Sequence, residues 1–199
     1  MIVYLDLDRT LFRTHDSGRQ ILDKVGELFE GIDVAQAYAD RDKYYQPLGD
    51  MYYHDMTEQL GDLGLDAQHV YKALLNSELA DGRFEIYGCG DLIKGLQAHG
   101  VEVKIFTFGP DDFQRFKVQL CPSLRELEVI TTLRPKHELL DIYEHECWMV
   151  DDKPIGHELP GNVSFVQVSL ETNAKLPPND WPIFYSLKDV KEFFDDVFA

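Results

Sequence analysis

The chain has 199 residues, of which 44% are hydrophobic and 12% aromatic, enough apolar side chain to fill the core of one substantial domain. This composition excludes an intrinsically disordered chain, in spite of a formal net charge of -17. The acidic charge also makes this chain unlike proteins that bind nucleic acid or an anionic membrane through a basic surface. The apolar runs are only a few residues long, too short to span a bilayer.

The N-terminus and the cysteines indicate the cellular compartment. The chain begins Met-Ile-Val-Tyr-Leu-Asp, without the basic and then apolar segments of a secretory signal. Its three cysteines, Cys89, Cys121 and Cys147, are widely spaced and form no C-x-x-C pair. They are typical of reduced, buried thiols rather than of disulfides or a zinc site. We therefore expect a cytoplasmic protein without a nucleic-acid or membrane partner, and the number of subunits stays open.

Short apolar runs alternate with helical patterns through much of the chain. Runs typical of buried strands occupy residues 2–6, 101–106, 147–150 and 163–168, with a weaker one at 127–131. Helical patterns occupy residues 91–99, 111–120, 136–145 and 187–198. Strands that alternate with helices in this way predict an α/β fold with a doubly wound parallel sheet.

Residues 14–85 interrupt this alternation. Helical patterns cover four segments, residues 17–30, 34–46, 50–63 and 66–80, and no strand pattern stands out. Asp33 and Asp66 precede two of these segments in the place of an N-cap. We therefore expect a small all-helical insert over residues 14–85, and an α/β core made of residues 1–13 and 86–199.

Two aspartates lie at the end of the first predicted strand. Asp6 and Asp8 are two positions apart, so on an extended chain their carboxylates face the same side. The crevice beyond the carboxyl ends of parallel strands is where α/β folds place ligands. Such a pair can bind a divalent cation, or one carboxylate can act as a nucleophile while the other transfers protons. Alone, the same pattern also occurs in solvated acidic turns.

Three later features also place polar groups at the ends of elements. Thr107 follows the strand at 101–106, and Lys136 opens a helix directly after Pro135. Asp151 and Asp152 follow the strand at 147–150. A hydroxyl, an ammonium and further carboxylates can therefore meet the first two aspartates in one crevice.

The order D-x-D-x-T-L, strand-Thr, Lys, strand-Asp-Asp resembles the haloacid dehalogenase-like (HAD) superfamily of hydrolases. The resemblance runs from Asp6 to Asp152. It implies a Rossmann-like core, and the insert resembles the cap that this superfamily carries after its first motif. It further implies a Mg²⁺-dependent phosphatase that hydrolyses a small phosphorylated metabolite through an aspartyl-phosphate.

The resemblance also implies roles for individual residues. Asp6 would be the nucleophile and Asp8 the general acid and base. Thr107 would hydrogen-bond the phosphoryl oxygens, and Lys136 would neutralise charge on the nucleophile and the phosphate. A carboxylate at position 8 favours phosphate chemistry over dehalogenation, because the carbon–halogen cleaving members generally lack it.

For the metal, the resemblance implies that Asp6, Asp151 and the backbone carbonyl of Asp8 bind Mg²⁺. Asp152 would assist this site or orient Lys136, and the compact Asp-Asp-Lys of the fourth motif leaves its role open. The superfamily usually has glycine where this chain has Arg9. That change reflects either a different turn or a cation placed beside the substrate.

Some alternatives remain at this stage. A phosphomutase or phosphotransferase would use the same scaffold, and so would a weakly active binding or regulatory protein. An aromatic cluster in the insert also has two interpretations. Its members are Tyr44, Tyr45, Tyr52, Tyr53 and His54. Tyrosines at this spacing are typical of packing between helices, and contact with the substrate is the alternative.

Overall fold

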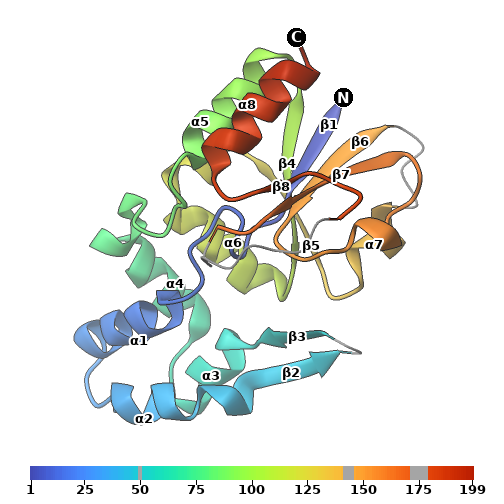
Figure 1. The fold of residues 1–199 in the computed structure, drawn as a ribbon. Helices are drawn as coiled ribbons and strands as arrows, with labels where there is room; N and C mark the ends of the chain where they lie inside the picture. The colour runs from blue at the N-terminus through green and yellow to red at the C-terminus, as the bar shows by residue number, and fades with distance from the viewer. Residues whose placement is uncertain (49–50, 141–145, 171–178) are drawn as a thin grey trace.

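Six strands of the described chain form one parallel sheet, the scaffold of the molecule (Figure 1). The computed structural model describes residues 1–48, 51–140, 146–170 and 179–199. In spatial order the strands are β5 (Glu128–Thr132), β4 (Glu102–Phe108), β1 (Ile2–Leu5), β6 (Cys147–Asp151), β7 (Val163–Val168) and β8 (Ile183–Phe184). Each neighbouring pair is parallel, and β1 lies in register between β4 and β6, so that Leu5 is beside Ile105 and Val150. The carboxyl ends of the strands therefore share one edge of the sheet.

Helices cover both faces of this sheet, because its strands are apolar on both sides. The helices of this part are α5 (Cys89–Ala98), α6 (Asp111–Leu120), α7 (Lys136–Leu140) and α8 (Leu187–Val197), with the 3-10 turns η3 (Pro122–Leu124) and η4 (Gly156–Glu158). α5 and α8 pack side by side on one face, in the same core cluster as Val3 and Leu5. Leu140 of α7 packs with Tyr4 and Met149 on the other face. The predicted doubly wound α/β fold is confirmed.

The structure differs from the predicted elements in small ways within this core. β8 is only two residues long, too short to give a pattern in the sequence. The helix predicted over 136–145 begins at Lys136 as α7 and is described as far as Leu140; residues 141–145 lie outside the described chain. No helix of the described ranges is long and apolar enough to cross a membrane.

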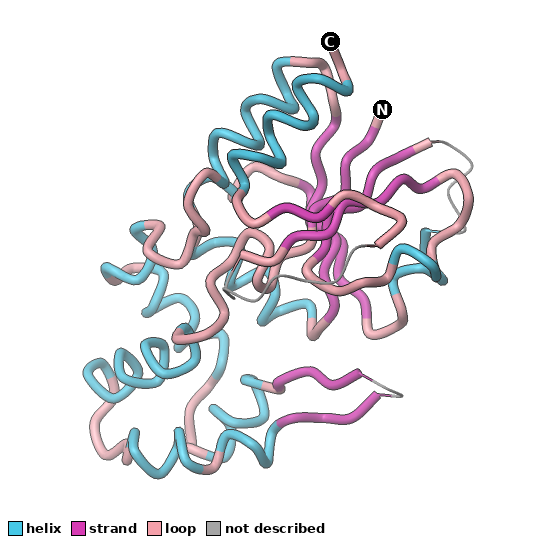
Figure 2. Tube along the Cα trace, in the orientation of Figure 1, coloured by secondary structure: helices cyan, strands magenta, loops and turns pink. Residues whose placement is uncertain are grey.

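The insert between β1 and α5 contains a β-hairpin, so the expectation of an all-helical insert is wrong. Its elements are α1 (Ser17–Leu28), α2 (Val34–Ala39), η1 (Arg41–Tyr44), β2 (Tyr45–Leu48), β3 (Met51–His54), α3 (Met56–Asp62), α4 (Ala67–Leu75) and η2 (Glu78–Asp81). β2 and β3 pair antiparallel, where helices were expected over 34–46 and 50–63. Pro47 cannot continue a helix and the tyrosines around it favour a strand. Figure 2 shows the hairpin apart from the main sheet, beyond the carboxyl ends of its strands.

The chain leaves the core for the insert and returns to it through two paired segments. The Arg13 N–H donates to the carbonyl of Phe84 at 2.7 Å, and the Ile86 N–H donates to the carbonyl of Leu11 at 2.9 Å. The ring of Phe12 stacks on Phe84 with centroids 5.4 Å apart. The two ends of the insert are thus joined to each other next to the end of β1.

The insert also packs against helix α6. Tyr71 of α4 stacks on Phe116 with ring centroids 4.5 Å apart. Thr57 of α3 donates a hydrogen bond to Asp112 at 2.6 Å. Because Val70 and Leu74 of α4 belong to the same core cluster as the strands, burial of apolar surface holds the insert in place.

We expect truncation of Phe194 in α8 to lower the stability of the whole fold. Its ring is 1% exposed and packs edge-on against Trp148, so Phe194→Ala leaves a cavity between helix and sheet. The free energy of unfolding should fall by about 3–5 kcal/mol, measured by urea unfolding. Val197 is 41% exposed at the end of the same helix. Val197→Ala is the matched control and should cost less than about 1 kcal/mol. Equal losses for the two variants would contradict the observed packing of α8.

Candidate functional site

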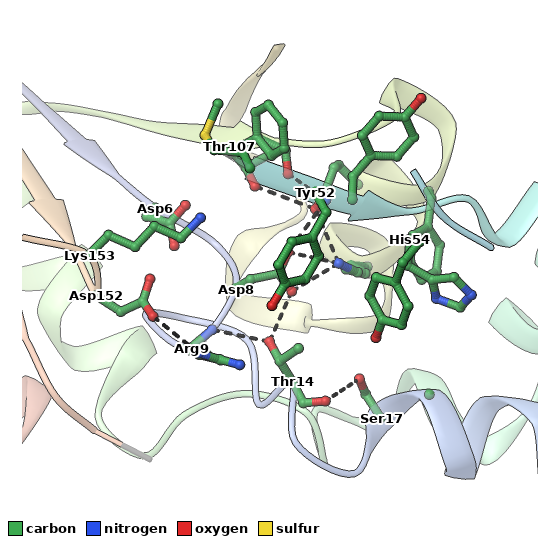
Figure 3. Close-up of a pocket in the computed structure, with 18 of the residues that line it drawn as sticks. Asp6, Asp8, Arg9, Thr14, Ser17, Tyr52, His54, Thr107, Asp152 and Lys153 are labelled. Atoms are coloured by element: carbon green, nitrogen blue, oxygen red, sulfur yellow. Dashed lines mark hydrogen bonds and ion pairs between the residues drawn. The ribbon is translucent and has the colours of Figure 1, made fainter. Parts of the chain in front are cut away.

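A cavity of about 1020 Å³ lies between the carboxyl edge of the sheet and the insert. Its walls come from the ends of β1, β4 and β6, from α6 and α7, and from the hairpin of the insert. Figure 3 shows Asp6, Asp152 and Lys153 on one side of this cavity and His54 on the other, with Asp8 between them. All the residues that the sequence singled out as site residues line the cavity.

Asp6 extends β1 by one residue into the site. Its N–H donates to the carbonyl of Val150 at 2.9 Å, which continues the pairing of β1 with β6. The side chain is 6% exposed, and the hydroxyl of Thr10 donates to its Oδ2 at 3.2 Å. This carboxylate is therefore held in a fixed position at the floor of the cavity.

Lys136 lies between two of the carboxylates. Its Nζ is 2.5 Å from Oδ1 of Asp6 and 2.6 Å from Oδ2 of Asp151. Burial by itself would lower the pKa of Lys136, but the two adjacent carboxylates outweigh it and raise the pKa. Lys136 is therefore a permanent cation in direct contact with Asp6.

Asp6, Asp151 and Asp152 form an acidic cluster in which each offers an oxygen within 4.8 Å of the others. The pKa of Asp6 is raised by burial and by the charges of Asp151 and Asp152, against the opposing effect of Lys136. The pKa of Asp152 is also raised, first by burial and then by Asp151. Carboxylates crowded in this way repel each other, and a divalent cation relieves that repulsion. The donor set consists of hard oxygens, as Mg²⁺ requires.

Asp8 lies apart from this cluster, paired with a lysine of α6. Lys117 Nζ is 2.8 and 2.9 Å from the two carboxylate oxygens, and the Thr14 hydroxyl donates to Oδ1 at 2.9 Å. Burial alone would raise the pKa of Asp8, but the ammonium of Lys117 and these hydrogen bonds lower it. Asp8 is therefore a carboxylate at neutral pH in this arrangement.

Gln114 connects Thr107 to Asp8. The Thr107 hydroxyl, 1% exposed at the end of β4, donates to Oε1 of Gln114 at 3.4 Å. The amide of Gln114 in turn donates to the Phe108 carbonyl at 3.0 Å and to Asp8 at 3.4 Å. A side chain at Gly109 would collide with this amide, since a Cβ there would lie 2.2 Å from Nε2. Two groups of polar residues thus form, one around Lys136 and one around Gln114.

Sequence reasoning did not identify Gln114 or Lys117. The signal was present in α6, where Phe113, Phe116 and Leu120 mark the buried stripe of the helix. Lys117 falls on this same stripe, and its side chain is only 8% exposed. A lysine on the buried face of a helix needs an anionic partner, and that requirement predicts a nearby carboxylate.

Arg9 adopts a left-handed backbone conformation, with φ of +63°. This conformation favours glycine, so the chain makes a turn suited to glycine with an arginine in its place. Its N–H donates to the carbonyl of Phe12 at 2.9 Å. Its guanidinium is 3.9 Å from Asp152, at the mouth of the cavity (Figure 3).

The chain is similar to known proteins in its fold. No protein-family model matches the chain, and no curated protein sequence matches it either. Solved structures do match over almost the whole chain. A haloacid dehalogenase-like hydrolase from Burkholderia xenovorans LB400 has a TM-score of 0.64 at 18% identity, covering 99% of this chain and 97% of its own. A HAD phosphatase from Thermococcus onnurineus has a TM-score of 0.62 at 17% identity, covering 97% of each chain.

A third structure is a HAD-hydrolase from Bacillus subtilis bound to magnesium. Its TM-score is 0.55 at 14% identity, covering 98% of each chain. All three likenesses extend over 97% or more of this chain, so they include both the sheet and the insert. The chain has the fold of the haloacid dehalogenase-like hydrolases, as the order of its motifs predicts.

Proposed function

We propose that this chain is a Mg²⁺-dependent phosphatase that hydrolyses a phosphorylated metabolite through an aspartyl-phosphate on Asp6. The observation that carries the proposal is the buried contact of Asp6 with Lys136, beside the cluster of Asp151 and Asp152. A phosphoryl group needs neutralised charge and fixed geometry more than covalent chemistry, and this site offers both. Similar folds named hydrolases and phosphatases support the same conclusion.

The acidic cluster would hold the Mg²⁺. Asp6, Asp151 and Asp152 supply carboxylate oxygens there, and the backbone carbonyl of Asp8 completes the proposed set. When bound, the metal would neutralise the charge of the phosphoryl oxygens. The structure bound to magnesium that shares this fold is consistent with such a site.

The residues around Asp6 would act directly on the phosphate. Asp6 would attack phosphorus in line with the leaving oxygen, because its carboxylate is fixed by Thr10 and Lys136. Lys136 would neutralise charge on both Asp6 and the phosphoryl group. Thr107 lies at the end of β4, and its hydroxyl donates a hydrogen bond to Gln114. With substrate bound, the hydroxyl would donate that hydrogen bond to a phosphoryl oxygen instead.

Asp8 would be the proton carrier. Its lowered pKa keeps it ionised in the resting site, which is the form needed to take a proton from the water that attacks the phosphoenzyme. A bound phosphate dianion adds negative charge beside Asp8, and this favours its protonated form. In that form Asp8 can protonate the departing alcohol in the first step.

The insert of residues 14–85 would act as a cap over the site. It supplies half of the cavity wall, including the hairpin. In this position it would exclude bulk water during phosphoryl transfer and select the organic part of the substrate.

Asp6→Asn should abolish phosphate release from p-nitrophenyl phosphate in the presence of Mg²⁺. The amide keeps the size of the side chain but is not nucleophilic, and it removes one charge from a crowded acidic cluster. Circular dichroism and urea unfolding should show a folded protein of at least wild-type stability. A folded Asp6→Asn variant that still turns over at the wild-type rate would rule out Asp6 as the nucleophile.

Mg²⁺ should raise the thermal midpoint as well as the rate. A cation that binds only the folded chain stabilises it by about 2.7 kcal/mol at 100 times its Kd. Asp151→Asn should reduce the Mg²⁺-dependent shift in a thermal unfolding scan. Asp196→Asn is the control, because Asp196 is exposed on α8 and outside the cluster. Full activity after exhaustive chelation would contradict the proposed metal dependence.

Lys117→Met should destabilise the protein in a pH-dependent way. The lowered pKa of Asp8 gives stability that is present above its ordinary pKa of about 3.9 and is lost as pH falls through the folded-state value. Without the ammonium, burial would raise that pKa. The free energy of unfolding at pH 7 should then fall by about 1–3 kcal/mol.

The loss should shrink near pH 4, where Asp8 of the variant is protonated. Urea unfolding at several pH values measures it, and Lys117→Arg, which keeps the charge, should lose less. A loss that does not change with pH would show that Lys117 contributes packing rather than charge.

A further inference from the structure

Both strands of the insert's hairpin contribute to the cavity wall, and Met51 and Tyr53 are part of that wall. Tyr45 lies opposite His54 across the two strands, and Pro47 lies opposite Tyr52. Because side chains alternate along a strand, these four residues share one face, and all four line the cavity. We refer to Tyr45, Pro47, Tyr52 and His54 as the aromatic face.

The rings of the aromatic face are arranged around Tyr45. The ring of His54 stacks on it, with centroids 5.2 Å apart and an interplanar angle of 27°. Tyr52 meets Tyr45 edge-on at 5.6 Å and 83°. The Nε2–H of His54 donates a hydrogen bond to Oε1 of Gln59 at 2.8 Å. Burial lowers the pKa of His54, so the imidazole is neutral at pH 7. This face is therefore an uncharged aromatic surface.

Much of this surface is open to the cavity. Tyr52 is 67% exposed and Tyr45 is 40% exposed, although both lie at a concave site. The sequence predicts that the tyrosines of the insert pack between helices. For Tyr45 and Tyr52 this prediction is wrong, because both lie on the hairpin. Tyr44 is separate, because it donates its hydroxyl to Asp62 and does not line this cavity.

The cavity is large for the phosphate chemistry at its floor. At about 1020 Å³ it is slightly larger than the usual range of pockets for organic ligands, about 300–1,000 Å³. Asp6, Tyr52 and His54 all line this one cavity (Figure 3), and Lys136 lines it as well. A phosphate that carries only a short carbon chain would fill a small part of this volume.

On the basis of the proposed function, we infer that the substrate is a phosphate monoester whose organic part ends in a planar heteroaromatic ring, as in a nucleoside monophosphate. The phosphate would lie at Asp6 and Lys136, and the ring would stack on Tyr52 and meet Tyr45 edge-on. Aromatic side chains stack on any nucleobase, since every base has a π face, so this contact selects for a ring rather than for one base.

The test compares nucleoside 5′-monophosphates with ribose 5-phosphate. Both kinds of substrate release phosphate from the same type of 5′-alcohol, and only the first carries a base. The wild type should show a kcat/KM for the nucleotide about tenfold or more above that for ribose 5-phosphate, the scale of one base–aromatic stack. Tyr52→Ala should reduce this ratio by about tenfold, whereas Tyr52→Phe should retain it. Tyr87→Ala is the control, because Tyr87 is 90% exposed and outside the cavity.

The outcomes separate this inference from the proposed function. Equal kcat/KM values for the two substrates, or a ratio that Tyr52→Ala leaves unchanged, would overturn the aromatic subsite while the phosphatase activity stands. Absence of phosphate release from every substrate would overturn the proposed function. In that case titration calorimetry of the wild type with a nucleoside monophosphate decides the inference. Binding that Tyr52→Ala weakens supports it, and no binding overturns it.

Discussion

The contact of Lys136 with Asp6 and Asp151 is the interaction on which the site depends. Parallel pairing of β1 with β6 places two carboxylates at neighbouring strand ends, away from bulk water, where like charges are costly to bury. The first residue of α7 supplies the compensating ammonium. The sheet order places the two carboxylates, and the short loop before α7 places the Nζ of Lys136 between them. The proposed chemistry depends on this one nitrogen atom. In the proposed function, an entering phosphate would meet a lysine that Asp6 and Asp151 already hold in position.

Helix α6 connects the second half of the site to the insert. Its Lys117 and Gln114 hold Asp8 and Thr107, while Asp112 and Phe116 on the same helix contact Thr57 and Tyr71 of the insert. A single rigid element thus carries both the partner of the proposed proton carrier and the docking surface of the proposed cap.

Much of the core and of the Asp6 cluster could be predicted from the sequence, because both follow from local rules. Apolar runs buried on two faces identify strands, and the edge at which parallel strands end brings together residues as far apart as Asp6 and Asp151. The hairpin was missed because the periodicity of residues 34–63 was assigned to helices, although Pro47 and the tyrosines of residues 44–53 favoured a strand. The pairing of Asp8 with Lys117 was missed for another reason. The buried position of Lys117 indicates that it needs an anion, but its partner is 109 positions away and depends on how α6 packs.

The paired segments at the two ends of the insert have a mechanical consequence. The hydrogen bonds that join Arg13 to Phe84 and Ile86 to Leu11 lie only a few residues from Asp8, whereas the hairpin lies beyond the carboxyl edge of the sheet (Figure 1). An object that pivots near one end moves little there and much at the other. A small rotation about these hydrogen bonds would carry Tyr52 a long way while leaving the carboxylates almost in place. Access for the large substrate inferred above and constancy of the proposed reacting geometry are thus compatible in one chain.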